Sequence, residues 1–123
     1  MILNEDRFSS ALLVAEGNSP AHLLFDDVGC MLDYRGEHPE LVIIDAFVHD
    51  YVSRRWLSAR SSSFVMASPG VLPTPMGSGI AAFPTADAAA GQAQTWSAAV
   101  LGYDGLVQAR SAWKQARRAS GAP

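Results

Sequence analysis

The first half of the chain alternates short apolar runs with turn residues, which predicts a hairpin, a helix and a third strand. "FSSALLV" (8–14) and "AHLLFDD" (21–27) are typical of strands, and "EGNSP" between them is rich in turn-forming residues. A short helix is expected next, capped by one aspartate of the pair Asp26–Asp27 and running to about Tyr34. The β-branched run "ELVIIDAFVHDYV" (40–52) predicts the third strand.

The second half repeats this order. Its pattern predicts one or two strands at residues 54–68, a loop at 69–79 and a short strand at 80–85. An Ala-rich helix is expected at 85–96 and a last short strand at 98–106. The loop follows from three prolines and three glycines in 11 residues, and Thr85 is the expected N-cap of the helix. Strand–strand–helix–strand therefore occurs twice, which suggests an internal structural duplication.

The end of the chain predicts a basic amphipathic helix. Apolar side chains recur there at helical spacing, at Leu106, Ala109, Trp113 and Ala116. The basic side chains fall largely on the other face of this helix. We therefore expect an α+β fold of two small ββαβ units, residues 1–52 and 53–106, with a C-terminal basic helix at residues 107–123.

Composition and charge narrow the classes of function. The chain has 123 residues, 49% of them hydrophobic, which suffices for a core, and no apolar run approaches the ~18 residues of a membrane helix. The opening "MILNEDRFSS" lacks the basic start and apolar segment of a signal peptide.

The charge is unevenly distributed along the chain. All 12 acidic residues and five of the nine basic residues lie in residues 1–104. This part has no basic stripe of the kind that binds nucleic acid. The basic tail can bind an acidic partner or anionic lipid, or lie over the acidic body.

The most informative candidate residue is Met76, in the segment "PTPMG". Pro75 fixes its own φ and Gly77 allows a sharp turn, so the methionine sits in a stiff segment of a kind usually found at the surface. A thioether is a soft ligand that prefers Cu(I) to harder divalent ions. The alternative is that Met76 folds back and fills a gap in the core.

Other candidate groups carry weaker signals. Cys30 is the only cysteine, which excludes an internal disulfide, and it adjoins Met31. Neighbouring side chains on a helix point about 100° apart, so these two do not easily share an ion, and a buried structural cysteine is the alternative. The pair Asp26–Asp27 can act as a general acid or base, or cap a helix. His22 and His49 lie in predicted strands, but no HxH or HExxH spacing links the histidines.

Five segments, in this order and at these spacings, resemble the NosL family of accessory proteins for copper delivery to nitrous oxide reductase. They are "RFSSALLV", "LLFDDVGCMLDY", "FVHDYVSRRWLSARSSSFVMAS", "TPMGSGIAAF" and "VLGYDGL". The resemblance covers about residues 1–106, and its most specific part is the unusual Pro–Met–Gly loop. It implies a fold of two ββαβ units, which the family shares with the organomercurial lyase MerB.

The resemblance also implies a function and a set of ligands. One Cu(I) would be bound and handed on without turnover, and the family's loop methionine falls on Met76. The methionine of the family's N-terminal Cys–Gly–Met motif falls on Met1, and the lipid-modified cysteine of that motif would lie two positions earlier. The soft donors are then Met1, Cys30, Met31, Met66 and Met76, joined by His49 or His22. We expect an internal methionine to have been taken as the start.

Three functions follow as hypotheses. The first is a monomeric Cu(I) metallochaperone that works in the periplasm or outside the membrane, with nitrous oxide reductase or its assembly machinery as partner. The second, an enzyme with MerB-like chemistry, needs two thiolates and an acid, and the chain has one cysteine; we therefore expect no enzyme. The third is a metal-free NosL-like interaction module that has lost the copper site and docks through its tail or loop.

Overall fold

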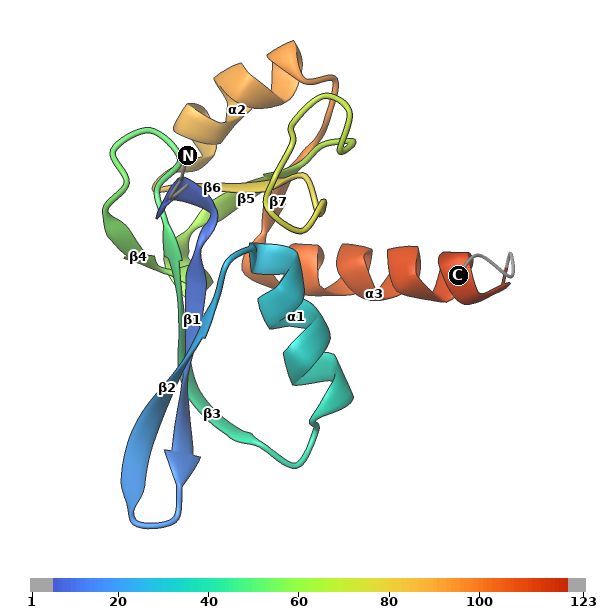
Figure 1. Ribbon diagram of the computed structural model, residues 1–123. Helices are drawn as coiled ribbons and strands as arrows, with labels where there is room; N and C mark the ends of the chain where they lie inside the picture. Colours follow the sequence, from blue (N-terminus) through green and yellow to red (C-terminus); the bar gives the residue numbers. More distant parts are fainter. Residues whose placement is uncertain (1–5, 120–123) are drawn as a thin grey trace.

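Two antiparallel sheets and three α-helices make up residues 6–119, the part of the chain that the computed structural model describes (Figure 1). The first sheet has the order β2-β1-β3-β4, with β1 (Ser10–Glu16), β2 (Ser19–Phe25), β3 (Val42–His49) and β4 (Trp56–Ser58). The second has the order β6-β5-β7, with β5 (Ser63–Met66), β6 (Ile80–Phe83) and β7 (Val100–Gly102). The helices are α1 (Val28–Glu37), α2 (Ala86–Thr95) and α3 (Tyr103–Ala119), and 3-10 turns occur at Asp6–Phe8 and Ala59–Ser61.

Both sheets are built by a strand–strand–helix–strand segment of the same topology. In each segment the first strand is central and pairs with the other two, giving β2-β1-β3 and β6-β5-β7. The expected α+β fold with a doubled ββαβ order is therefore confirmed. β4 is an additional edge strand that pairs with β3 in the first sheet. The division of the chain at residues 52 and 106 stays a prediction.

Local sequence signals explain the first hairpin and both caps. Gly17 has a φ of +63° at the first position of the two-residue turn between β1 and β2, a place that suits glycine in a type II′ turn. Asp27 caps α1 and Thr85 caps α2, each by accepting a hydrogen bond from a backbone N–H of the first turn. The segment 54–68, left open as one strand or two, forms β4 and β5.

Two predicted helix limits are wrong. α1 does not end near Tyr34 but continues to Glu37, and it stops where Pro39 disfavours a helical conformation for the residue before it. α3 begins at Tyr103, so "YDGL" belongs to the helix and not to the last strand. The first turn of α3 contains Asp104, whose carboxylate stabilises the positive end of the helix dipole.

β5 and β6 of the second sheet are largely buried on both faces and join two hydrophobic clusters, whereas β7 is mostly exposed. On β5, Phe64 points into the cluster under α1, whereas Val65 points into the cluster under α2. β6 does the same, with Ile80 in the first cluster and Phe83 in the second. This explains why "IAAF" is continuously apolar, since a strand without a solvent face does not alternate.

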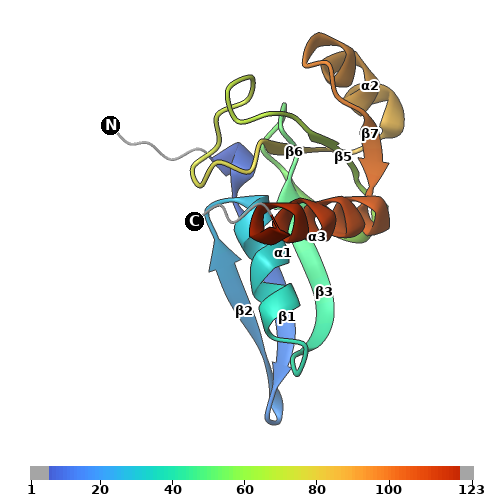
Figure 2. The same ribbon diagram turned by 90° about the vertical axis from the view of Figure 1, so that its right-hand side faces the viewer.

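α1 and α3 lie on the same side of the first sheet, as both ribbon views show (Figures 1 and 2). α1 packs against β1 and β2, and α3 packs against α1, with Leu106 fully buried in the first cluster. Within residues 6–119, no helix is both long and apolar enough to span a bilayer.

Of the glycines in the described part of the chain, Gly79 is the one whose replacement should destabilise the fold most. Its φ is +72°, and a Cβ atom there would lie 2.0 Å from the carbonyl oxygen of Ala67. We expect Gly79→Ala to lower the free energy of unfolding by about 3 kcal/mol or more, because left-handed strain adds to a backbone clash. Gly91→Ala is the control, because its Cβ would meet open space in the middle of α2 and should stabilise by about 1 kcal/mol. Denaturant unfolding measures both, and equal stability of the two variants would contradict this packing.

Candidate functional site

One buried carboxylate holds the Pro-rich loop in place. Asp27 is 0% exposed, and it caps α1 by accepting a hydrogen bond from the Gly29 N–H at 2.8 Å. The same carboxylate also accepts hydrogen bonds from the Pro-rich loop. The donors are the Thr74 hydroxyl at 2.5 Å, the Met76 N–H at 3.0 Å and the Ser78 N–H at 3.4 Å. The Ser78 hydroxyl also donates to this carboxylate. The start of α1 and the loop are therefore one hydrogen-bonded unit.

Met76 stands at the tip of a tight turn within this loop. The Gly77 N–H donates to the Thr74 carbonyl at 3.0 Å, which closes a four-residue turn with Pro75 in second place and Met76 in third. The Thr74 hydroxyl oxygen also accepts from the Ser78 N–H at 2.9 Å. The Met76 residue is 65% exposed. It therefore projects into solvent and does not fill a gap in the core.

The base of the loop is anchored in the second cluster, beside the start of the described chain. Leu72 is buried together with Phe8, and the Ala67 N–H donates to the Gly79 carbonyl at 2.8 Å. A cavity of about 450 Å³ separates the loop from the first 3-10 turn; it is lined by Arg7, Phe8, Tyr51, Leu72, Pro73, Thr74 and Pro75. Figure 2 shows the loop next to the segment at Asp6–Phe8.

Gly29 allows α1 and the loop to meet. A Cβ atom at Gly29 would lie 2.5 Å from the Cβ of Ser78 and 3.3 Å from the guanidinium carbon of Arg110. Any larger side chain at this position would push the loop away from the helix. The glycine in "DDVGCM" therefore serves close approach between elements.

The environment of Asp27 favours its charged form. Burial raises the pKa of a carboxyl group, but here the hydrogen bonds from Ser78, Thr74 and the backbone outweigh burial, and the pKa lies below its ordinary value of 3.8. Asp27 is therefore ionised at neutral pH and acts as an acceptor. The sequence left open whether the Asp26–Asp27 pair caps a helix or transfers protons, and the structure supports the cap.

Two of the predicted ligands lie on α1 directly after Asp27. The backbone N–H groups of Cys30 and Met31 both donate to the Asp27 carbonyl. Met31 is 0% exposed and packs in the first cluster, whereas Cys30 is partly buried. Burial, and then the nearby carboxylate of Asp27, raises the pKa of the Cys30 thiol, which opposes formation of a thiolate. The backbones of Cys30, Met31 and Met76 thus converge on Asp27 while their side chains differ in exposure.

The remaining predicted donors lie elsewhere. His49 is buried on β3, its Nδ1 lies 3.1 Å from the Ser9 carbonyl oxygen, and its ring stacks on Trp56 with centroids 3.8 Å apart. The Ser9 hydroxyl oxygen also lies near this nitrogen, 2.9 Å from Nδ1. Met66 packs against the first cluster. Met1 lies outside the described residues.

Among residues 6–119, no three or more His, Cys, Asp or Glu side chains gather closely enough to hold a metal ion. The most exposed sulfur among the described residues is the thioether of Met76, since Cys30 and Met66 are partly buried and Met31 is enclosed. Thr74 and Ser78, the two hydroxyl residues that flank Met76, were not singled out from the sequence. Both hydroxyl groups bond Asp27, some fifty residues away in sequence, and no local pattern indicates this partner.

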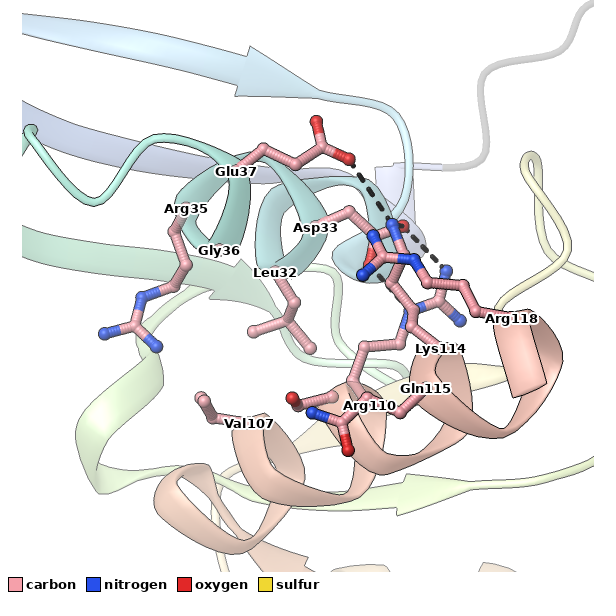
Figure 3. A pocket seen from close by; sticks show the side chains of 11 residues that line it. Leu32, Asp33, Arg35, Gly36, Glu37, Val107, Arg110, Lys114, Gln115 and Arg118 are labelled. Carbon is pink, nitrogen blue, oxygen red and sulfur yellow. Dashed lines mark hydrogen bonds and ion pairs between the residues drawn. The ribbon is translucent and has the colours of Figure 1, made fainter.

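A second cavity, of about 230 Å³, lies between α1 and α3 and is lined mainly by charged side chains (Figure 3). Arg110 forms a two-point ion pair with Asp33, both distances being 2.9 Å, and Lys114 lies 3.3 Å from Glu37. In Figure 3, Arg110 and Lys114 point toward the acidic side chains of α1. The basic C-terminal helix α3 therefore lies over α1, and the ion pairs between Arg110 and Asp33 and between Lys114 and Glu37 hold the two helices together.

The fold is similar to that of a solved structure, the crystal structure of the copper chaperone NosL from Shewanella denitrificans. The TM-score is 0.69, the sequence identity is 18%, and the match covers 85% of this chain and 82% of that chain. No protein-family model and no curated protein sequence matches the chain. The chain thus has a NosL-like fold, and at this identity the likeness establishes the fold alone.

The hydrogen bonds to Asp27 predict an acid-dependent loss of stability. Since the folded state lowers the pKa of Asp27, its contribution is complete above the ordinary value of 3.8 and disappears as the pH falls through the lower folded value. We expect the free energy of unfolding to drop less steeply between about pH 5 and pH 2 in Asp27→Asn than in the parent chain. Urea unfolding at several pH values measures this. The exposed neighbour Asp26→Asn is the matched control, and an unchanged slope in Asp27→Asn would contradict the role of this carboxylate.

Proposed function

We propose that the protein is a Cu(I)-binding metallochaperone of the NosL type, which carries copper for the maturation of nitrous oxide reductase. The observation that carries this proposal is the exposed thioether of Met76, held at the tip of a turn whose backbone is fixed by Asp27. The likeness of the whole fold to a copper chaperone supports it. Copper is here the cargo of the protein, bound once and passed on.

The chemistry of the donor fits Cu(I). A thioether is neutral and soft, so it favours Cu(I) over Zn²⁺ or harder ions, and it needs no deprotonation before it binds. A site at the tip of an exposed loop lets a partner approach the metal directly. Both properties suit transfer of an ion more than permanent storage.

The start of the chain is the proposed source of a second donor. Arg7 lines the same cavity as Pro75, the residue before Met76. Met1, six residues before Arg7 in sequence, is the second sulfur donor that we propose for this site. Cu(I) is then shared between Met76 and the N-terminal segment.

The other predicted ligands fit this site less well. Met31 is enclosed in the core, and the His49 ring is engaged by Ser9 and Trp56. Cys30 has a raised pKa, whereas the thiolate is the form that binds metal. We therefore assign Met76 and Met1 to the copper site and leave Met31 and His49 to the fold.

A carrier explains the observed groups better than an enzyme does. Cleavage of a carbon–mercury bond would need two thiolates and a proton donor, and the chain has one cysteine. The proposed partner is nitrous oxide reductase or its assembly machinery, and the proposed compartment is the periplasm or the outer side of the membrane. Both proposals follow from the NosL-type assignment.

Replacing Met76 by leucine tests the proposal, because leucine keeps a similar volume and removes the sulfur. We expect the parent chain to bind one Cu(I) in an anaerobic titration against a competing chelator, and Met76→Leu to bind at least about tenfold more weakly. Met66→Leu is the control, since Met66 packs against the core, and it should bind as the parent does.

Each other outcome has a clear meaning. Parent-like binding by Met76→Leu would show that the loop is not the copper site. No Cu(I) binding by the parent chain would leave the metal-free interaction module as the better function.

A further inference from the structure

The loop that carries Met76 is held by hydrogen bonds from its backbone and its hydroxyl groups to the two oxygens of one carboxylate. Asp27 Oδ2 accepts from the N–H groups of Met76 and Ser78 and from the Thr74 hydroxyl. The other oxygen, Oδ1, accepts from the Gly29 N–H at the start of α1 and from the Ser78 hydroxyl. One carboxylate therefore ties the residue that bears the thioether to the end of a helix.

We propose that Asp27 is a positioning residue for the copper loop, which holds the Met76 backbone in its binding conformation before the metal arrives. This inference rests on the proposed function of the loop. A loop that is already ordered does not lose conformational freedom when it binds, so its affinity for the ion is higher than that of the same loop left free. Asp27 itself is fully buried, so it would act on the metal site through the loop backbone and not as a ligand.

The chemistry of the site requires a carboxylate. Both oxygens face donors, and a carboxylate has only acceptor atoms. An asparagine amide would place its NH₂ group against the Met76 N–H in one orientation and against the Gly29 N–H in the other. Asp27→Asn must therefore release either the loop or the helix cap, although its size is unchanged.

Thr74 allows one of the bonds between the loop and Asp27 to be removed without touching the cap. Its hydroxyl donates to Asp27 Oδ2 and accepts from the Ser78 and Gly79 N–H groups. Thr74→Val has nearly the same shape and loses all three contacts, while the Gly29–Asp27 bond of the cap remains. The bonds from the Met76 and Ser78 N–H groups to Asp27 also remain in Thr74→Val, so its effect on the loop should be smaller than that of Asp27→Asn.

The experiment measures loop order and copper affinity separately in the parent, Asp27→Asn, Thr74→Val and Asp26→Asn. Amide hydrogen exchange of Met76 and Ser78, recorded without metal, reports whether the loop is held. Anaerobic Cu(I) titration against a chelator reports affinity, and denaturant unfolding shows that each variant is folded. Asp26 is exposed and carries the same charge one residue away, so Asp26→Asn controls for charge.

We expect Asp27→Asn to exchange the Met76 amide at least tenfold faster and to bind Cu(I) about tenfold more weakly, Thr74→Val to change both in the same direction but by less, and Asp26→Asn to match the parent. If the parent and Met76→Leu differ in Cu(I) binding while Asp27→Asn and Thr74→Val both behave as the parent in exchange and affinity, the positioning role is overturned and the proposed function stands. If the parent does not bind Cu(I), the proposed function fails. The positioning role for copper then fails with it, whatever the exchange rates show about the loop.

Discussion

The Asp27 carboxylate is the interaction on which the rest of the site depends. It is fully buried, and a buried charge is stable only when its lone pairs are occupied by donors. The N–H of Gly29 in α1 and groups of Thr74, Met76 and Ser78 in the loop provide these donors. The helix and the loop are some fifty residues apart in sequence, and neither would satisfy the charge alone. Their mutual dependence keeps a Pro- and Gly-rich segment in one conformation at the surface.

This arrangement separates the parts of the loop that pack from the part that faces solvent. Leu72 is buried at the base, and Ser78 is buried against Gly29 at the return. Between them, Met76 projects from a turn whose backbone is already bonded. Methionine usually fills gaps in a core, as Met31 does here, whereas Met76 is exposed on a fixed turn. The backbone N–H groups of both residues donate to Asp27, so the difference in exposure follows from their places on a helix and at the tip of a turn.

Much of the fold could be predicted from local patterns, because caps, turns and apolar runs act over a few residues. Thr85, Asp27 and Gly17 are examples, and the repeated strand–strand–helix–strand order followed from them. The start of α3 at Tyr103 was missed because "VLGYDGL" is compatible with a strand until the contact of Leu106 with the core is known. The anchoring of Met76 by Asp27 could not be predicted for the same reason. Hydrogen bonds between residues far apart in sequence leave no periodic trace, although an exposed Met76 was one of two stated alternatives.

The central strands of the second sheet have a consequence for the physical unity of the chain. Adjacent residues of β5, Phe64 and Val65, belong to different clusters, and the first of these clusters also contains Leu12 and Val48 of the other sheet. The first strand–strand–helix–strand segment therefore shares its interior with the second. Separation of the two segments would expose this common apolar surface to water, which favours folding of both in one cooperative step.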